Sequence, residues 1–248
     1  MLQFDQPAIF QSFPKLVTAQ STRHGGISPA PYQSLNLGLH TKDQKKNVYE
    51  NRRRYFAALG IETDQLAYSH QVHQDQIIEV KKAGSYEGFD ALITQQTDVF
   101  LSVTIADCTP ILIYDAQAKV VAAIHAGWRG TVAQIVAKTL ARMQAKYQTQ
   151  AKNCYAYIGT CIDAKNFEVG AEVAEKFSPA LKTWSPDRQK FLIDLKTANQ
   201  QQLLAAGLPA HQIEIATTST IIDNHRYFSY RQEKTTTGRM LAVIGMRS

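Results

Sequence analysis

A thiol and two imidazoles are the side chains of this sequence best suited to chemistry. Cys108 follows an apolar run that ends at Thr104, and His125 closes another such run, so each is expected where a strand gives way to a loop. His73 lies upstream, just before a third apolar run. One cysteine and two histidines can hold zinc and leave a fourth position for solvent, as in catalytic zinc sites. The sequence therefore offers a candidate His-Cys-His metal centre.

The spacing of these three residues does not by itself identify a metal site. There are 34 residues between His73 and Cys108 and 16 between Cys108 and His125, which matches no zinc-finger or protease pattern. Cysteine is among the most buried residue types, so a structural role is the ordinary alternative. Cys108 and His125 could also form a nucleophile and its base. From the residues alone, these alternatives stay open.

The segment after His125 indicates an anion site. A helix is predicted to begin with Thr131 as its N-cap, directly after the turn at 127–130. The free N–H groups and the dipole of a helix start bind phosphate, and the guanidinium of Arg129 can hold two oxygens of a phosphate or carboxylate. We therefore expect an anion to bind beside the candidate metal centre.

The elements that must position these residues are short strands with helices outside them. Apolar runs rich in valine and isoleucine predict strands at 76–80, 91–94, 99–104, 111–115, 120–125, 155–158 and 241–246. Helical spacing indicates helices at 47–59, 132–143, 171–177 and 195–206. Strands follow one another both directly and with helices between them, which favours an α+β fold of mixed β-sheets. Residues 21–50, rich in glycine and proline, are predicted to form a long ordered loop of functional importance.

Length and composition favour a single domain spanning residues 1–248. No segment approaches the roughly 18 consecutive apolar residues of a membrane helix, and the N-terminus lacks a signal-peptide pattern, so we expect a cytoplasmic protein that binds no membrane. Its three cysteines are an odd and sparse set, which favours reduced thiols over a disulfide framework.

The net charge of +6 is modest for this length. Its densest part is Lys45 and Lys46 with the run 52–54, which consists of three arginines. We interpret this part as the solvent-facing side of a helix, because no aromatic side chains alternate with it as base-stacking platforms would. We therefore expect no nucleic-acid partner, whereas an anionic small substrate would suit the charge.

The chain also resembles a known family from near its first residue to its last. The blocks that carry the resemblance are TRHGGIS at 22–28, LNLG at 35–38, QVH at 71–73, DALIT at 90–94, ADC at 106–108, HAGWRG at 125–130, IGTCI at 158–162 and TGRM at 237–240. They occur in the order seen in the laccase-domain proteins, also called YfiH-like or peptidoglycan-editing-factor proteins. HAGWRG is the most specific of these blocks. Thr160 departs from the proline that family members often have there.

The resemblance implies both a fold and an activity. The family fold is two sheets packed as a sandwich between helices, an α/β/β/α arrangement. The family's zinc ligands fall on His73, Cys108 and His125. The implied activity is that of a purine nucleoside phosphorylase that cleaves adenosine, inosine, guanosine and methylthioadenosine, with adenosine deaminase activity in the same site. We expect purine nucleosides and phosphate as the partners of a monomeric protein.

These activities assign roles to further residues. Deamination requires a proton carrier near the metal, for which Asp107, Asp90 and His24 are the candidates nearest in sequence. Phosphorolysis requires fixed donors around phosphate, and we expect Arg129 and Arg23 to supply them. Asn36, which can both donate and accept, suits ribose or base recognition. We interpret Arg231 and Arg239 as structural, with phosphate binding as their alternative.

Three other functions compete with this one. The family's older name, polyphenol oxidase, would require a cluster of many histidines for copper, and the chain has seven histidines in all, although one copper on the same three ligands is chemically allowed. A Cys-His hydrolase could edit a peptidoglycan precursor with Cys108 as nucleophile and His125 as base. A non-enzymatic purine-binding module would bind nucleosides and release no free base.

Overall fold

The computed structural model describes residues 2–234 and 236–248, which form two six-stranded sheets and a smaller third sheet. The first sheet has, in spatial order, β1 (Phe4–Asp5), β2 (Leu16–Ser21), β15 (Met240–Met246), β7 (Phe100–Ile105), β3 (Leu66–His70) and β5 (Gly84–Glu87). The second has β14 (Ile213–Ile215), β10 (Cys154–Ile158), β8 (Thr109–Asp115), β9 (Val120–Ala126), β6 (Ala91–Thr94) and β4 (Ile77–Glu79). Both sheets are mixed, since β3 runs parallel to β7 while β7 runs antiparallel to β15, and β4 runs parallel to β6 while β6 runs antiparallel to β9.

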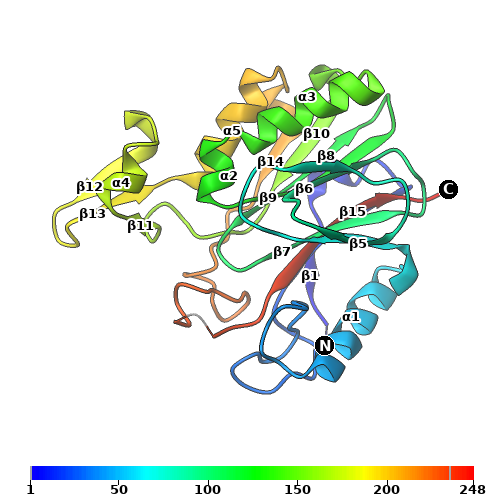
Figure 1. The fold of residues 1–248 in the computed structure, drawn as a ribbon, viewed down its shortest axis with the longest axis horizontal. Helices are drawn as coiled ribbons and strands as arrows, with labels where there is room; N and C mark the ends of the chain where they lie inside the picture. The colour runs from blue at the N-terminus through cyan, green and yellow to red at the C-terminus, as the bar shows by residue number, and fades with distance from the viewer. Residues whose placement is uncertain (1, 235) are drawn as a thin grey trace.

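The two large sheets pack face to face and carry helices on their outer faces (Figure 1). Helix α1 (Lys45–Ala58) covers the first sheet, and α3 (Ile135–Tyr147) with α5 (Leu195–Ala205) covers the second. Single 3-10 turns occur at Ala8–Phe10, Thr63–Gln65, Ala151–Asn153, Pro179–Leu181 and Ala210–Gln212. The layers therefore follow the order helix, sheet, sheet, helix. The expected α+β sandwich flanked by helices is confirmed.

Strand β8 shows why the core strands are continuous apolar runs. Ile111 and Ile113 pack toward α3 and α5, whereas Leu112 and Tyr114 pack between the two sheets. Successive side chains of a strand point to opposite faces, and here both faces are buried. The predicted strands at 91–94, 99–104, 111–115, 120–125, 155–158 and 241–246 are all present within two residues of their expected ends.

A small lobe beside the sandwich was not predicted. It consists of β11 (Glu168–Val169), β13 (Lys190–Ile193), β12 (Lys182–Ser185) and the short helix α4 (Ala171–Ala174), and it projects from the left of the sandwich in Figure 1. The helix expected over 171–177 ends early, at Ala174. These strands are short and largely half-buried or exposed, so they lack the apolar run that marks a core strand.

The helix expected to begin at Thr131 is organised differently. Helix α2 (Trp128–Val132) begins directly after Gly127, so Thr131 lies inside it, with its hydroxyl near the Asn199 side chain rather than capping a helix. Gln134 then takes a left-handed conformation, and α3 starts at Ile135. The prediction of Thr131 as N-cap was wrong because the turn at 127–130 is itself helical.

The long loop predicted over 21–50 is shorter in the structure: residues 22–44 form no helix or strand, and α1 begins at Lys45. Asn51 of α1 stabilises this loop by donating to the Ser28 hydroxyl and to the carbonyl oxygens of Ser34 and Asn36. None of the helices in the described part of the chain has the length and apolarity needed to cross a bilayer.

Candidate metal centre and ligand pocket

The two sheets bring three turns together at one end of the sandwich. Strands β3 and β7 are parallel, so the turns that carry His73 and Cys108 leave the first sheet at the same edge. Strand β9 ends beside the start of β8, where Ala126 pairs with Thr109. His125 therefore comes next to Cys108 from the second sheet. The topology assembles residues that lie far apart in the sequence.

His73, Cys108 and His125 form a compact donor cluster. Their candidate ligand atoms, one from each residue, lie within 4.8 Å of one another, and no other group of three such donors occurs in residues 2–234 and 236–248. The rings of His73 and His125 are perpendicular, with centroids 4.8 Å apart. His125 is buried, Cys108 is half-buried and His73 is exposed, so the cluster has a closed side and an open side.

Asp90, at the start of β6, holds two of the three residues in place. Its Oδ1 accepts from His125 Nδ1 at 2.8 Å and from the backbone N–H of His73 at 3.0 Å. Its Oδ2 accepts from the backbone N–H groups of Val72 and Gln74 at 3.2 and 2.9 Å. Asp90 thus fixes the tautomer that leaves Nε2 of His125 as the ligand nitrogen, as carboxylates behind zinc-bound histidines do.

Two of the turns have left-handed backbone at residues other than glycine. His73 has φ = 59°, and Asp107, which precedes Cys108, has φ = 86°. Such conformations cost on the order of 1 kcal/mol each and cluster at functional sites. At His73 the cost is offset by the three N–H groups that Asp90 accepts. Both turns aim a donor side chain inward at the expense of local stability.

The electrostatics of the cluster favour a thiolate. Burial opposes ionisation of Cys108, but His125 and His73 outweigh it and lower the pKa of Cys108 to about 6. Burial likewise opposes protonation of His125, but the Cys108 thiolate and Asp90 raise the pKa of His125 to about 9. A metal ion would take the place of the proton between them, because metals bind thiolate and neutral imidazole. The donor set therefore fits a zinc ion, or copper.

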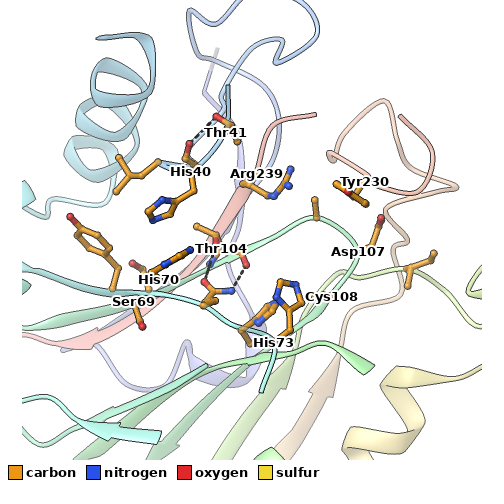
Figure 2. Close-up of a pocket in the computed structure, with 18 of the residues that line it drawn as sticks. His40, Thr41, Ser69, His70, His73, Thr104, Asp107, Cys108, Tyr230 and Arg239 are labelled. Atoms are coloured by element: carbon orange, nitrogen blue, oxygen red, sulfur yellow. Dashed lines mark hydrogen bonds between the residues drawn. The ribbon is translucent and has the colours of Figure 1, made fainter. Parts of the chain in front are cut away.

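The cluster lies in a pocket of about 510 Å³, a size typical of small-molecule sites. Figure 2 shows His40 and His70 on one side of this pocket, Tyr230 and Asp107 on the other, and Arg239 between them. Three arginines line it, at positions 52, 231 and 239, against one carboxylate among the described residues, that of Asp107. The pocket thus combines aromatic walls with an excess of positive charge.

The three residues expected to bind substrate or phosphate, Arg23, Asn36 and Arg129, do not line the pocket. Arg23 forms an ion pair with Glu233. Asn36 is fully buried behind the pocket, where its Oδ1 accepts from the backbone N–H of Arg239. Arg129 is exposed and stacks on Trp128, its guanidinium carbon 4.4 Å from the ring centroid. Arg129 follows His125 by four residues, but its side chain is exposed on α2 and does not line the pocket.

Of the three candidate proton carriers, Asp107 lines the pocket and the other two do not. Asp107 Oδ1 accepts from the Thr220 hydroxyl at 2.6 Å, and its Oδ2 accepts from the backbone N–H of Arg231 at 2.7 Å. Asp90 lies behind His125 and does not line the pocket, and neither does His24.

Sequence reasoning missed Arg52, His40 and His70, and it interpreted Arg231 and Arg239 as structural, yet all five line the pocket. The interpretation of residues 52–54 as a solvent-facing run was wrong for Arg52, which is 5% exposed. Its position four residues after Val48 and four before Phe56 places it on the buried stripe of α1, a signal that helical periodicity could have given.

Similarity to known proteins extends over the whole fold. A sequence profile described as "Multi-copper polyphenol oxidoreductase laccase" matches residues 17–247. A protein named purine nucleoside phosphorylase from Bacteroides thetaiotaomicron is 34% identical over 260 residues, spanning 98% of this chain and 95% of that protein. Another of that name from Deinococcus radiodurans is 39% identical over 230 residues, spanning 92% and 88%. The crystal structure of YlmD from Geobacillus stearothermophilus matches with a TM-score of 0.92 at 32% identity, covering 99% of both chains. This chain therefore belongs to the multi-copper polyphenol oxidoreductase laccase family, the laccase-domain proteins that its sequence resembles.

Proposed function

We propose that the chain is a zinc-dependent purine nucleoside phosphorylase. Its substrates would be adenosine, inosine, guanosine and methylthioadenosine, and it would deaminate adenosine in the same pocket. The observation that carries this proposal is the His-Cys-His cluster in a pocket lined by arginines and aromatic rings. Relatives named purine nucleoside phosphorylase support it. We further propose that the protein is cytoplasmic, in keeping with three unpaired cysteines, and that it acts as a monomer.

One side of the pocket suits a purine base. Ile162 and Phe167 are buried apolar residues there, and Tyr230 is partly exposed at the mouth. Flat aromatic side chains bind a base by stacking, a contact that is tolerant of base identity. We propose that this side receives the base, which would let one site accept several purine nucleosides.

The metal-holding role falls on His73, Cys108 and His125. Zinc bound by these three residues would supply a Lewis acid with a position open to solvent or substrate. Asp90 holds His125 and the backbone of His73 in position. Asp107 is the carboxylate that faces the pocket, so we propose it as the group that moves a proton at the substrate.

A Cys-His hydrolase acting on a peptidoglycan precursor is the second candidate. The lowered pKa of Cys108, due to His125 and His73 despite burial, is also what a nucleophilic cysteine requires. A multi-copper oxidase is less well supported, because the described residues contain a single cluster of three donors. Copper on that one cluster remains chemically allowed.

A product assay tests the proposal. The metal-loaded protein is incubated with each of the four nucleosides, with and without phosphate, and free base, inosine and ribose 1-phosphate are measured by chromatography. We expect phosphate-dependent release of free base and, from adenosine, inosine formation without phosphate. Cys108→Ala should abolish both, whereas the control Cys154→Ala, in the buried strand β10, should retain them. Release of no base by the wild-type protein under any metal would overturn the phosphorylase.

A further inference from the structure

We propose that Arg52, His40 and His70 form the subsite that binds inorganic phosphate, at the side of the pocket opposite Tyr230. This inference rests on the proposed phosphorolysis and gives its second substrate a place. The location differs from the helix start near Arg129 that the sequence indicated.

Arg52 is a buried cation whose side chain reaches the pocket from α1. It is 5% exposed, and its guanidinium carbon lies 4.9 Å from the ring centroid of Tyr68 and 5.2 Å from that of Phe56. Its Nη1 donates to the carbonyl oxygen of Leu37 at 3.1 Å. Within residues 2–234 and 236–248, the Arg52 side chain makes this one hydrogen bond. The rest of the guanidinium fork is left for a ligand in the pocket that it lines.

No carboxylate of the described chain pairs with Arg52. The next two residues of α1, Arg53 and Arg54, are exposed and share Glu50. Burial lowers the pKa of Arg52 to about 10, which reflects the cost of removing its charge from water. Two aromatic faces and one carbonyl offset part of that cost, and an anion in the pocket would offset the rest.

His40 and His70 place two more donors beside this cation. Tyr68 and His70 are two residues apart on β3 and therefore share one face of the strand. The rings of His40 and His70 lie against each other, with centroids 4.4 Å apart (Figure 2). Nδ1 of His70 lies 3.1 Å from the carboxylate of Glu87, and its Nε2 has no partner within the part of the chain that is described. An arginine fork and two imidazoles are donors that suit a phosphate.

The opposite side of the pocket is less suited to an anion. The carboxylate of Asp107 lies on that side and would repel an anion. Arg231 is exposed there and donates to the carbonyl oxygen of Glu168. Arg239, which lies between the two sides in Figure 2, gives Nη1 to the carbonyl oxygens of Thr237 and Gly238. One side of the pocket thus has aromatic rings, the Asp107 carboxylate and an exposed arginine, whereas the other has the buried Arg52 and two imidazoles, one of them beside the exposed Glu87 carboxylate.

Steady-state kinetics of the metal-loaded protein test this division. In Arg52→Lys, which keeps the charge and removes the fork, we expect the KM for phosphate to rise roughly tenfold or more, as loss of a charged hydrogen bond predicts. The KM for adenosine should change less than about twofold. His40→Asn and His70→Gln, both at exposed positions, should raise the KM for phosphate by smaller factors. Arg53→Lys, one residue along the same helix and exposed, is the matched control and should match the wild-type protein.

Calorimetric titration of the resting protein with inorganic phosphate separates this inference from the proposed function. If phosphate binds to the wild-type protein and not to Arg52→Lys, but no nucleoside is cleaved, the subsite stands and the phosphorylase is wrong. If cleavage occurs and all three variants keep the wild-type KM for phosphate, the subsite is wrong and the phosphorylase stands. Should Arg52→Lys fail to fold, His40→Asn and His70→Gln decide by the same criterion. Arg52-dependent binding of adenosine 5′-monophosphate without binding of inorganic phosphate would also overturn the assignment.

Discussion

Gly127, two residues after His125, sets the space available around the donor cluster. A Cβ atom at this position would lie 3.2 Å from Cys108 Sγ, 3.4 Å from His73 Cδ2 and 3.9 Å from His125 Cε1. The absence of a side chain therefore lets the start of α2 approach all three candidate ligands. The HAGWRG block therefore has glycine at position 127 because the backbone there passes close to the donor cluster.

We expect Gly127→Ala to weaken metal binding by roughly tenfold, the lower end of what perturbing the surroundings of a metal site costs. The added methyl group would lie 3.2 Å from Cys108 Sγ, so the thiolate would have to shift by a few tenths of an ångström. Competition with a chromophoric chelator measures the affinity. The metal-free variant should unfold at the wild-type temperature, because the methyl group faces the cluster. An unchanged metal affinity would show that the three residues do not converge on one ion.

The reactivity of Cys108 should depend on pH in the metal-free protein. The thiolate is the reactive form, and a pKa of about 6 means that it is populated above that pH. Alkylation by iodoacetamide should therefore rise as pH increases from 5 to 7 and level off above. Bound zinc should protect the thiol. Cys154 and Cys161, whose pKa values burial raises to about 12 and about 11, are internal controls that should stay unmodified. Equal alkylation of Cys108 with and without zinc would favour the hydrolase.

At this scale, the sequence predicted the donors better than their surroundings. Cys108 and His125 could be found because each lies where an apolar run gives way to a loop, and His73 because it lies just before another such run; resemblance supported the three as one metal site. The pocket-lining role of Arg52 was hidden because its neighbours Arg53 and Arg54 are exposed. Arg129 was expected beside the metal centre, but in α2 it is exposed and stacks on Trp128.

Among the elements, the turn at 71–74 depends most on a single side chain. Asp90 accepts the N–H groups of residues 72, 73 and 74 and also holds His125. Burial raises the pKa of Asp90, but the hydrogen bonds from His125 and the backbone outweigh it and hold the pKa below its usual value. One carboxylate thus couples β6, β9 and the turn after β3.

We expect Asp90→Asn to lower metal affinity by roughly 10- to 100-fold. It should also destabilise the metal-free protein by about 1–3 kcal/mol, because the amide N–H₂ would face backbone donors. Chelator competition and urea unfolding measure the two effects. Asp75→Asn, which removes an exposed ion pair with Lys138 near the same turn, should change neither appreciably. If Asp90→Asn behaves like Asp75→Asn, the carboxylate does not position the cluster.

Most strands buried on both faces were predictable, and the edge strand β4 was also predicted, at 76–80, whereas β2 and β3 inside the first sheet were not. Strands β6 to β10 are marked by valine and isoleucine, whereas β11, β12 and β13 are short and mostly accessible. The sequence also could not show which strands pair, since β3 and β7 meet across more than 30 residues. That pairing is what brings the ligand turns together.

For the whole molecule, we propose that residues 1–248 behave as one domain. Trp128 and Val132 of α2 pack against the apolar cluster that contains Ile193 of the lobe. Thermal unfolding followed by circular dichroism and by tryptophan fluorescence should therefore give one coincident transition. Trp128→Phe leaves Trp184, in β12, to report on the lobe alone. An earlier transition of Trp184 would show that the lobe is a separate domain.

The most direct test of the account is the metal and its ligands in the purified protein. Elemental analysis with X-ray absorption spectroscopy should find one zinc ion per chain bound by one sulfur and two imidazole nitrogens, with the sulfur lost in Cys108→Ala. A protein that takes up no zinc or copper, or whose metal shows no sulfur ligand, would contradict a centre built from His73, Cys108 and His125.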